Sequence, residues 1–516
     1  MSLRRPSEWR PGGDVRAVRH PATARSGSAV PVDGPVLVAG GGIAGMAAAV
    51  GLAERGVSVI MVEPYPQLGG RVRAWPVQHG MDATTMSRGF HAFFRQYYNL
   101  RGLLRRVDPA LSRLTPLIDY PLVLADGHTD SFAKIPLTPP LNMAAFVAQS
   151  PSFRLRDLAA VDVPAAMELL DVSFPDTFSA YDGESADQFL DRLRFPDGAR
   201  HLALEVFARS FFAHPKDFSA GELVAMFHAY FLGSSEGLLF DVPDDDYETA
   251  FWGPLRHYLA GLGVELRLGD RVTGLSTETD GVQVMLGSGT QISATAVVVA
   301  TDPVTTRDLL LESGVGDDPW RDRVAAVRTA PPFAVWRIWL DRLVDPARPP
   351  FIGTAGFGPL DNISVLERFE DGARRWSSAH GGSVVELHAY ALVDQSDERA
   401  LKDRLRSEMH RIYPELTDAS VLAEEWLVSD DCPLAGTGPW RDRLTVDTPD
   451  PCIVLAGDGI RCDYPVALME RAATTGFLAA NQLLADRGLS GHDLWTVPMH
   501  SRNWVSAPLH RLLTHS

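Results

Sequence analysis

Short runs of consecutive apolar residues recur along the chain, and the first two enclose a glycine-rich turn near the N-terminus. Pro35-Val-Leu-Val-Ala39 has the length and composition of a buried parallel strand. An alanine-rich stretch from about Ile43 to Arg55 predicts a helix, and Val57-Ser-Val-Ile-Met-Val62 predicts a second strand. The pattern therefore predicts the strand–helix–strand unit of a parallel sheet.

The uncharged stretch over residues 34–53 is almost long enough to cross a bilayer as a helix. It contains six glycines, however, and three of them are consecutive at positions 40–42. Glycines in such a cluster favour a turn over a continuous helix. We therefore expect no transmembrane segment here or elsewhere in the chain.

The turn carries the pattern Gly-x-Gly-x-x-Gly at Gly40, Gly42 and Gly45. The first glycine permits a tight turn, the second lets the backbone approach a pyrophosphate, and the third lets the helix pack on the strand. The helix would begin at Ile43 and Ala44, so its free amide groups and the positive end of its dipole would face the phosphates. These residues predict a dinucleotide-binding turn.

The acidic residue that such a site needs is also present. Glu63 ends the second predicted strand, 18 residues after Gly45, where a carboxylate binds ribose hydroxyls. A glycine-rich turn without a ligand would not need this acidic partner. We therefore predict that the unit binds a dinucleotide.

Composition and charge narrow the class of protein. The 516 residues are 45% hydrophobic and 22% charged, as in ordinary soluble globular proteins. The formal net charge of −17 argues against a nucleic-acid partner. The three cysteines have no Cys-x-x-Cys spacing, which suits a reducing compartment and predicts neither a zinc site nor a disulfide framework.

The two ends of the chain differ from the rest. Residues 1–33 hold six arginines against three acidic residues and lack the apolar core of a secretory signal. We expect a solvated, partly disordered tail, with a basic arm that touches anionic lipid as the alternative. Residues 489–516 are expected to form a C-terminal tail.

Two further motifs extend the pattern beyond a plain nucleotide-binding unit. After Glu63 the chain reaches Gly69-Gly70-Arg71, a second glycine pair that a plain NAD domain does not need. Near the C-terminus the strand-like run Cys452–Ala456 leads to Gly457-Asp458, and a helix is predicted after Pro465. Together these motifs resemble the flavoprotein superfamily that includes amine oxidases and carotenoid desaturases.

The resemblance implies FAD as the cofactor and gives each motif a role. Arg71 would place positive charge beside the pyrophosphate and flavin, and Asp458, which follows Gly457, would accept hydrogen bonds from the ribityl hydroxyls. The helix after this motif would direct its first backbone amides, including that of Ala467, at the flavin. A valine in the family, here Val272, meets the adenine through its backbone.

The same resemblance implies an α/β fold. A Rossmann-like FAD-binding domain of the amine oxidase and phytoene desaturase type would be interleaved with an α+β substrate domain. The runs Val264–Val272 and Ala296–Pro303 would add strands to the nucleotide-binding sheet. The FAD-binding domain would comprise residues 34–115, 236–310 and 445–488, and the substrate domain residues 116–235 and 311–444.

The segment Arg88–Arg101 is unusually dense in mixed aromatic and polar residues. It resembles the Gly-x-His-x-x-Phe-x-x-Tyr-x-Asn-Leu signature of plant-type carotene desaturases. Its Phe-Phe-Arg-Gln-Tyr-Tyr version is most similar to the isorenieratene synthases, which are bacterial carotenoid φ-ring synthases. Such enzymes desaturate a β-ionone ring of β-carotene and shift one methyl group, leaving an aromatic ring. The resemblance covers most of residues 34–490.

That chemistry would require hydride transfer to oxidised FAD, a methyl shift in the resulting cation, and proton loss in a pocket that excludes water. His91 is the candidate base, because an imidazole has an ordinary pKa of roughly 6.5. A hydrogen-bonded structural histidine is the alternative. Arg95 would position the flavin or its surroundings and Tyr97 would face the ring, with a structural role as the favoured alternative for both.

Residues 205–240 predict helices rich in aromatic side chains. These side chains would fill the core of the substrate domain or, alternatively, line a long tunnel for a polyene. His214 and His228 lie in this segment without an acidic or thiol partner at a ligand spacing. We therefore predict no metal site.

A carotene is insoluble in water, so we expect a cytoplasmic protein attached peripherally to the inner face of the membrane. Residues 135–158 are the candidate contact, with their own core as the alternative. Within this segment the helically spaced residues are Leu141, Ala145 and Ala148, the apolar residues beside them are Met143, Phe146 and Val147, and the candidate phosphate contacts are Arg154 and Arg156.

Two other functions remain open at this stage. One is a different flavin-dependent desaturase or oxidase of the superfamily, acting on amines, phytoene or ζ-carotene. The other is a prenyl-lipid carrier without redox chemistry, which the intact flavin motifs disfavour. The acceptor that reoxidises FAD is open between oxygen, a quinone and a partner protein.

Overall fold

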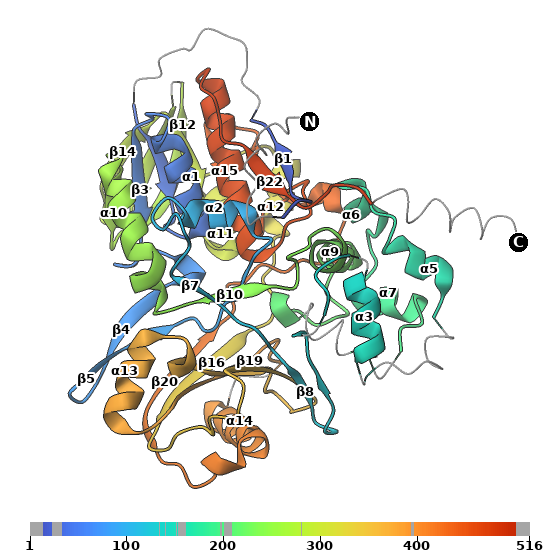
Figure 1. Cartoon of the computed structure of the whole chain (residues 1–516). Coiled ribbons are helices and arrows are strands. Elements are labelled where there is room, and N and C mark those ends of the chain that lie inside the picture. Colours follow the sequence, from blue (N-terminus) through green and yellow to red (C-terminus); the bar gives the residue numbers. More distant parts are fainter. Residues whose placement is uncertain are drawn as a thin grey trace, which may run out of the picture.

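Five parallel strands form the sheet that the apolar runs predict (Figure 1). The computed structural model describes residues 14–22, 34–133, 135–139, 141–150, 152, 161–196, 199–200, 209–279, 281–393 and 397–501. Both faces of the sheet are covered, so the strands inside the edge strand β11 are almost continuously apolar. In sheet order the strands are β11 (Glu265–Leu268), β3 (Val59–Glu63), β2 (Val36–Ala39), β15 (Ala296–Val299) and β21 (Ile453–Leu455).

Helices cover one face of this sheet. Every residue of the helix after the glycine turn is buried, because a second helix from the C-terminal region packs on it. A Cβ at Gly476 would lie 2.3 Å from the Ala44 carbonyl oxygen, so only glycine allows these two helices to approach so closely. The helices on this face are α1 (Ile43–Ala53), α2 (Tyr98–Leu104), α10 (Gly253–Gly261) and α15 (Leu468–Asp486).

The opposite face carries a small antiparallel sheet and two helices. Trp320 and Val324 share a hydrophobic core with Leu37 and Val299 of the parallel sheet. This layer therefore continues past residue 310, where the sequence places the domain boundary. Its elements are β12 (Val272–Glu278), β13 (Gly281–Leu286), β14 (Gln291–Ala294), α11 (Pro303–Glu312) and α12 (Asp318–Ala325).

A seven-stranded sheet forms the second half of the molecule, in the lower part of Figure 1. Its pairs are antiparallel except for β8 and β17. In sheet order the strands are β20 (Val421–Ser429), β16 (Phe333–Leu340), β19 (Val384–Ala389), β18 (Asn362–Val365), β17 (Phe351–Ala355), β8 (Leu122–Leu124) and β9 (Thr129–Asp130). The helices of this half are α13 (Asp371–His380) and α14 (Glu398–Ile412).

Short strands connect the two halves. A hairpin and a three-stranded sheet lie between the parallel sheet and the seven-stranded sheet (Figure 1). The three-stranded sheet joins the desaturase-like segment to residues almost 150 positions later, since Phe93 pairs with Asp241. The strands are β4 (Ala74–His79) with β5 (Asp82–Ser87), and β6 (Phe93–Phe94) and β7 (Leu114–Pro116) on either side of β10 (Phe240–Pro243).

A group of helices stands at one side of the second half, at the right of Figure 1. The segment predicted to be helical and aromatic contributes α9 and a π-helical turn over His228–Leu232, and its described aromatic side chains are mostly buried. Residues 201–208 lie outside the described residues. The helices are α3 (Leu141–Gln149), α5 (Val163–Glu168), α6 (Asp176–Ala180), α7 (Ala186–Arg192) and α9 (Ala220–Phe227).

The expectation of two free tails is wrong for residues 14–22 and 489–501. Strand β1 (Val18–His20) pairs antiparallel with β22 (Leu494–Thr496). Asp14 is fully buried, and its carboxylate accepts hydrogen bonds from the Tyr98 hydroxyl at 2.7 Å and the Ser235 hydroxyl at 3.0 Å. Strand pairing and this satisfied carboxylate fix both segments to the body of the protein.

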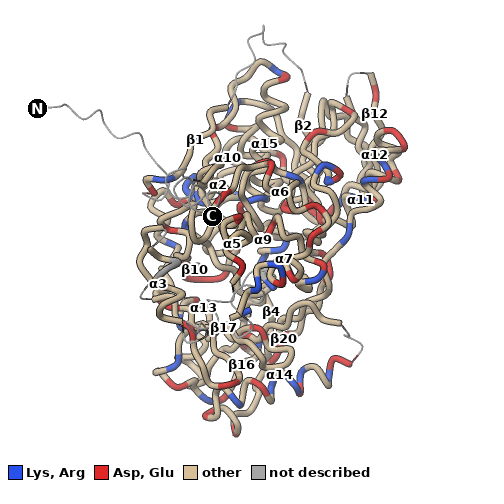
Figure 2. Tube along the Cα trace, turned by 90° about the vertical axis from the view of Figure 1, so that its right-hand side faces the viewer, with Lys and Arg blue, Asp and Glu red and all other residues tan. Residues whose placement is uncertain are grey.

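None of the described helices has the length and apolar content required to cross a bilayer. Basic and acidic residues are interspersed over the view in Figure 2 rather than gathered on separate faces.

Candidate active site

One cavity of about 1120 Å³ lies between the parallel sheet and the seven-stranded sheet. It exceeds the roughly 300–1,000 Å³ of an ordinary small-molecule pocket, which suits a site for more than one ligand. We call its two sides the nucleotide wall and the substrate wall. The nucleotide wall comprises Gly40, Gly42, Ile43, Ala44, Glu63, Gly69, Gly70, Arg71, Gly457 and Asp458, and the substrate wall comprises Phe90, His91, Phe212, Phe333, Phe351, Asn362, His388 and Tyr390.

The two glycine pairs predicted from the sequence meet at the nucleotide wall. The Gly69 amide donates to the Gly41 carbonyl oxygen at 2.8 Å, and Gly70 has a left-handed φ of 56°. A Cβ at Gly70 would lie 3.0 Å from the Gly42 Cα, whereas a Cβ at Gly42 would meet nothing closer than 3.8 Å. Gly42 therefore faces open space that a flat, extended ligand group can occupy.

Helix α1 directs its N-terminus at the same space. Its N-cap residue, Gly42, has no side chain to cap the first amides, and no acidic residue lies in the first turn. The amides of Ile43 and Ala44 therefore need an acceptor from elsewhere, which a pyrophosphate supplies. Gly45 has a packing role instead, because a Cβ there would lie 1.9 Å from the Gly40 carbonyl oxygen.

Glu63 lies at the end of β3, beside this turn. Its carboxylate accepts hydrogen bonds from the Gly41 amide at 2.7 Å and the Tyr65 amide at 3.1 Å. Burial raises the pKa of Glu63, and these two amides oppose the rise. The side chain is thus held at the carboxyl edge of the sheet, where ribose hydroxyls bind in this type of fold.

Arg71 and Asp458 form a two-pronged ion pair across the nucleotide wall. The guanidinium Nη2 lies 2.5 Å from Oδ1 and Nη1 lies 3.0 Å from Oδ2. Burial lowers the pKa of Arg71, but the Asp458 carboxylate outweighs burial and raises it. A cation and a group of oxygen acceptors thus stand where the resemblance assigns the pyrophosphate and ribityl contacts.

The remaining predicted cofactor contacts fall on either side of this pair. Val272 begins β12 and lines the cavity. Ala467 is the N-cap residue of α15 but lies behind the cavity wall, which is lined instead by Leu468 and Met469. Leu468 has a left-handed φ of 53°, so the chain makes a sharp turn between Ala467 and the body of α15. Periodicity of the helix gave no signal for such a turn.

The described nucleotide wall fits FAD. The open space above Gly42 and the uncapped amides of α1 match a pyrophosphate. The carboxylate of Glu63 matches the hydroxyls of a ribose, and that of Asp458 matches those of a ribityl chain. The substrate wall, by contrast, offers a flat ligand aromatic faces.

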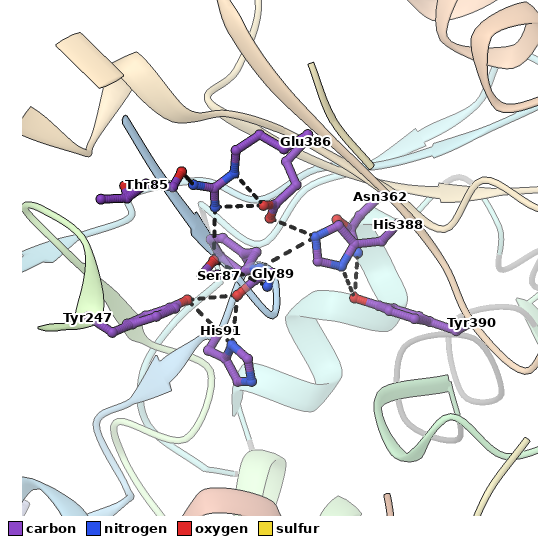
Figure 3. A network of polar contacts seen from close by, with 11 residues as sticks. Thr85, Ser87, Gly89, His91, Tyr247, Asn362, Glu386, His388 and Tyr390 are labelled. Atoms are coloured by element: carbon purple, nitrogen blue, oxygen red, sulfur yellow. Dashed lines mark hydrogen bonds and ion pairs between the residues drawn. The ribbon is translucent and has the colours of Figure 1, made fainter. Parts of the chain in front are cut away.

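His91 belongs to the substrate wall and lines the cavity. Its Nδ1 donates to the Gly89 carbonyl oxygen at 2.8 Å, and the Tyr247 hydroxyl also donates to that oxygen at 2.9 Å (Figure 3). A carbonyl can only accept, so Nδ1 carries the proton and Nε2 keeps a free lone pair. Burial lowers the pKa of His91 to about 4, so the imidazole is neutral at physiological pH.

Arg95 and Tyr97 occupy different environments from each other. Arg95 does not line the cavity; it pairs with Asp241 at 3.1 Å and with Glu236 at 4.0 Å. Tyr97 does line the cavity, but its hydroxyl is hydrogen-bonded to the Tyr230 hydroxyl at 3.0 Å. The structure thus brings His91 and Tyr97 to the cavity and ties Arg95 to carboxylates outside it.

Asn99, the last polar residue of the desaturase-like signature, joins two helices. Its side-chain amide donates to the Glu470 carboxylate at 2.9 Å and to the Thr474 hydroxyl at 2.9 Å. The Glu470 carboxylate also accepts the amides of Asn99 and Leu100, which begin α2. Burial raises the pKa of Glu470 to about 8. This part of the signature therefore fixes α2 to α15.

A chain of buried polar groups crosses the substrate wall, and the sequence reasoning missed it (Figure 3). Arg337 of β16 binds Glu386 of β19 at 2.7 Å, and Glu386 contacts His388 Nε2 at 2.8 Å. His388 Nδ1 lies 2.7 Å from the Tyr390 hydroxyl, which accepts the Asn362 side-chain amide at 2.9 Å. The signal for it was the alternation of polar residues at positions 386, 388 and 390, which places them on one face of a strand.

Aromatic rings form the apolar part of the substrate wall. Phe212 stacks on Phe333 with ring centroids 4.6 Å apart and makes a T-shaped contact with Tyr390 at 4.9 Å between centroids. Phe212 has a left-handed φ of 54°, a conformation that is rare for a residue with a bulky side chain and is often found at functional sites. Phe90 stacks on Phe351 at 4.4 Å. These rings suit a flat, apolar ligand.

The described residues contain no group of three or more side chains that could hold a metal ion. His228 has a structural role, because its Nε2 donates a hydrogen bond to the Pro498 carbonyl oxygen at 2.7 Å. Burial lowers its pKa to about 4.

Comparisons with known proteins agree with this geometry. Residues 43–484 match the family of flavin-containing amine oxidoreductases. A carotenoid phi-ring synthase of Streptomyces griseus is 53% identical over 481 residues, which cover 92% of this chain and 92% of that protein. A carotenoid phi-ring synthase of Chlorobaculum tepidum is 25% identical over 585 residues, covering 90% of each chain.

A solved structure shares the fold. Putrescine oxidase bound to putrescine superposes with a TM-score of 0.62 at 15% identity, covering 88% of this chain and 99% of that one. At this level of identity the likeness concerns the architecture alone, and it agrees with the α/β fold expected from the sequence.

Proposed function

The chain belongs to the family of flavin-containing amine oxidoreductases, and we propose that it converts the β-rings of a carotene into aromatic φ-rings. FAD is its cofactor. The observation that carries the proposal is the 53% identity to a carotenoid phi-ring synthase over 92% of both chains. The geometry agrees with it, since a nucleotide wall and an aromatic substrate wall share one cavity.

The residues of the cavity support each requirement of this chemistry. Bound FAD supplies a two-electron acceptor for hydride. The rings of Phe212 and Phe333 exclude water and offer π faces to a ring cation. His91 Nε2 accepts a proton from that cation, for which a weak base is sufficient because a carbocation is strongly acidic. Arg95 positions the desaturase-like segment through its carboxylate partners.

Pigment analysis tests the proposal directly. The chain is expressed in cells that accumulate β-carotene, and the extracted carotenoids are separated and identified by mass and absorbance. We expect products with one or two aromatic rings. Unchanged β-carotene, together with conversion of phytoene or ζ-carotene by the same protein, would instead assign a different desaturase activity.

We propose in addition that the protein draws its substrate from a membrane at α3. A row of stacked rings runs from the cavity toward this helix. Tyr120 and Phe132 line the cavity, with their ring centroids 4.7 Å apart. Phe146 of α3 stacks on Phe132, with 5.1 Å between the ring centroids. Outside this row, Leu137 and Leu141 are 48% and 60% exposed. Helix α3 carries no charged residue (Figure 2). Apolar insertion is therefore the expected mode of attachment.

The structure changes the set of candidates for this contact within the segment 135–158. Phe146 is only 7% exposed, so the expectation that it faces lipid is wrong; it belongs to the core of the helical group. Ala145 and Val147 are half-buried, and Ala148 is exposed. The side chain of Met143 and residues Arg154 and Arg156 lie outside what the structure describes.

Vesicle co-sedimentation tests the membrane contact. Replacing Leu137 and Leu141 with aspartate should release the protein from phosphatidylcholine vesicles without loss of flavin. Leu343, which is 51% exposed in the second half of the molecule, provides the control, and Leu343→Asp should bind like the native chain. Equal binding by both variants would remove α3 as the contact.

A further inference from the structure

The polar chain on the substrate wall has a composition that packing alone does not require. A carboxylate, an imidazole and a phenol follow one another in hydrogen-bonding order, and the last of them lines the cavity. Buried networks of this kind are costly unless every member is satisfied. This polar chain ends at Tyr390, which lines the cavity where the substrate would lie.

The direction of each hydrogen bond follows from the groups involved. Glu386 is buried with Arg337, and although burial opposes it, this guanidinium and His388 lower the pKa of Glu386 to about 2. The ionised carboxylate can only accept, so His388 Nε2 carries a proton and donates to it at 2.8 Å. The Phe90 amide also lies 3.4 Å from Nε2, a longer contact than that to the charged carboxylate.

In its neutral form with the proton on Nε2, His388 presents a bare Nδ1. The Tyr390 hydroxyl therefore donates to Nδ1 at 2.7 Å, and its oxygen accepts the Asn362 amide at 2.9 Å. The Tyr390 backbone amide is held by Asp361 at 2.6 Å. A carboxylate, an imidazole and a hydroxyl, hydrogen-bonded in this order, form the arrangement that prepares a hydroxyl oxygen to take up a proton.

We propose that Tyr390, acting through His388 and Glu386, is a second proton-accepting catalytic residue of the cavity. The inference rests on the proposed ring oxidation, in which each of two successive oxidations of one ring removes a hydride and a proton. His91 and Tyr390 lie on different sides of the loop at Gly89 (Figure 3), so one cavity offers two separate proton acceptors.

The proton step balances within the chain and substrate. Once hydride has left, a C–H bond next to the cationic carbon breaks and its electron pair becomes the new ring double bond. The proton passes to Tyr390 Oη while the phenol proton moves to His388 Nδ1. The resulting imidazolium is stabilised by the Glu386 carboxylate. Phe212, which makes a T-shaped contact with Tyr390, lines the cavity beside this residue.

Tyr390→Phe tests the assignment, because it removes only the hydroxyl. Purified protein is mixed with β-carotene in phosphatidylcholine vesicles, and flavin bleaching without oxygen is followed alongside the products formed with an electron acceptor. We expect bleaching at close to the native rate, aromatic product reduced by roughly a hundredfold, and accumulation of partly oxidised, non-aromatic rings.

Tyr413→Phe is the matched control. Tyr413 is buried on the α14 side of the same sheet, outside the cavity, and its hydroxyl has no hydrogen-bond partner among the described residues. This variant should keep the native product distribution. If Tyr390→Phe does not fold, His388→Gln carries the same test, because it removes the accepting Nδ1 and leaves the phenol.

Each outcome decides one of the two proposals. Aromatic product from Tyr390→Phe at the native rate, or equal losses of bleaching and product, would overturn the proton-accepting role. A native protein whose flavin is not bleached by β-carotene would instead overturn the proposed function.

Discussion

The two walls of the cavity present different kinds of chemical group to a ligand. The nucleotide wall presents mainly backbone: the open space at Gly42, the first amides of α1, and the glycine pair at Gly69. The substrate wall presents side chains, namely stacked phenylalanines with His388 and Tyr390, which the buried pair of Arg337 and Glu386 supports. Backbone recognition needs particular glycines at fixed spacing, whereas side-chain recognition can be assembled from many sequences.

This difference predicts how each wall will fail. A substitution in the nucleotide wall should remove the cofactor outright, because the added atoms stand in the ligand's place. A substitution in the substrate wall should change stability or the course of the reaction while the flavin stays bound.

The largest effect is expected from Gly42→Val. Its side chain would project into open space, so the protein should fold but lose flavin, as measured by the ratio of absorbance at visible and ultraviolet wavelengths. Gly45→Val is the matched variant: its Cβ would clash with the Gly40 carbonyl oxygen, so it should fail to fold. Full flavin occupancy in folded Gly42→Val would show that the pyrophosphate lies elsewhere.

The next effect concerns the buried pair of the substrate wall. Arg337→Met leaves the fully buried Glu386 carboxylate without its cation, which should lower the free energy of unfolding by about 3–5 kcal/mol. Denaturant titration of the flavin-loaded protein measures it. Adding Glu386→Leu should recover much of the loss, since no charge is then buried alone. A change within error in the single variant would mean that water reaches the pair.

His91→Ala should leave flavin bound and lower conversion of β-carotene to aromatic products by roughly a hundredfold. The reason is loss of the Nε2 acceptor of a residue that lines the cavity. Pigment analysis measures the conversion, and full conversion by the variant would show that His91 has a structural role. Rings that are desaturated but retain unshifted methyls would place its action after hydride loss.

The pH profile sharpens the same point. The folded-state pKa of His91 is lowered from 6.5 to about 4, so the neutral base is present above that value and is lost as pH falls through about 4. Activity should therefore not fall through a His91 titration between pH 8 and pH 5, whereas an ordinary histidine would titrate near 6.5. A fall centred near pH 6.5 that disappears in His91→Ala would contradict the buried, neutral state.

The smallest effect is expected from Tyr97→Phe. It removes one hydroxyl that is bonded to the Tyr230 hydroxyl, so stability should fall by about 1 kcal/mol and the product distribution should not change. Thermal unfolding and pigment analysis measure the two parts. A change in the product distribution would show that the Tyr97 hydroxyl takes part in the reaction and not only in packing.

The sequence by itself determined the parallel sheet and most of the nucleotide wall. Apolar runs predicted the strands β2, β3, β15 and β21, and Gly42 was found from the local spacing of the glycine motif. Arg71 was found from the family resemblance that the second glycine pair supports. Both signals lie within a few residues along the chain, where periodicity and glycine chemistry act.

Only the tertiary structure decided the rest. Arg337 and Glu386 are 49 residues apart, and they meet because β16 and β19 pair in a given register. Likewise Asp14 was placed in a tail by composition but is buried against Tyr98. Contacts between distant segments depend on strand pairing and packing, which no local pattern of residues encodes.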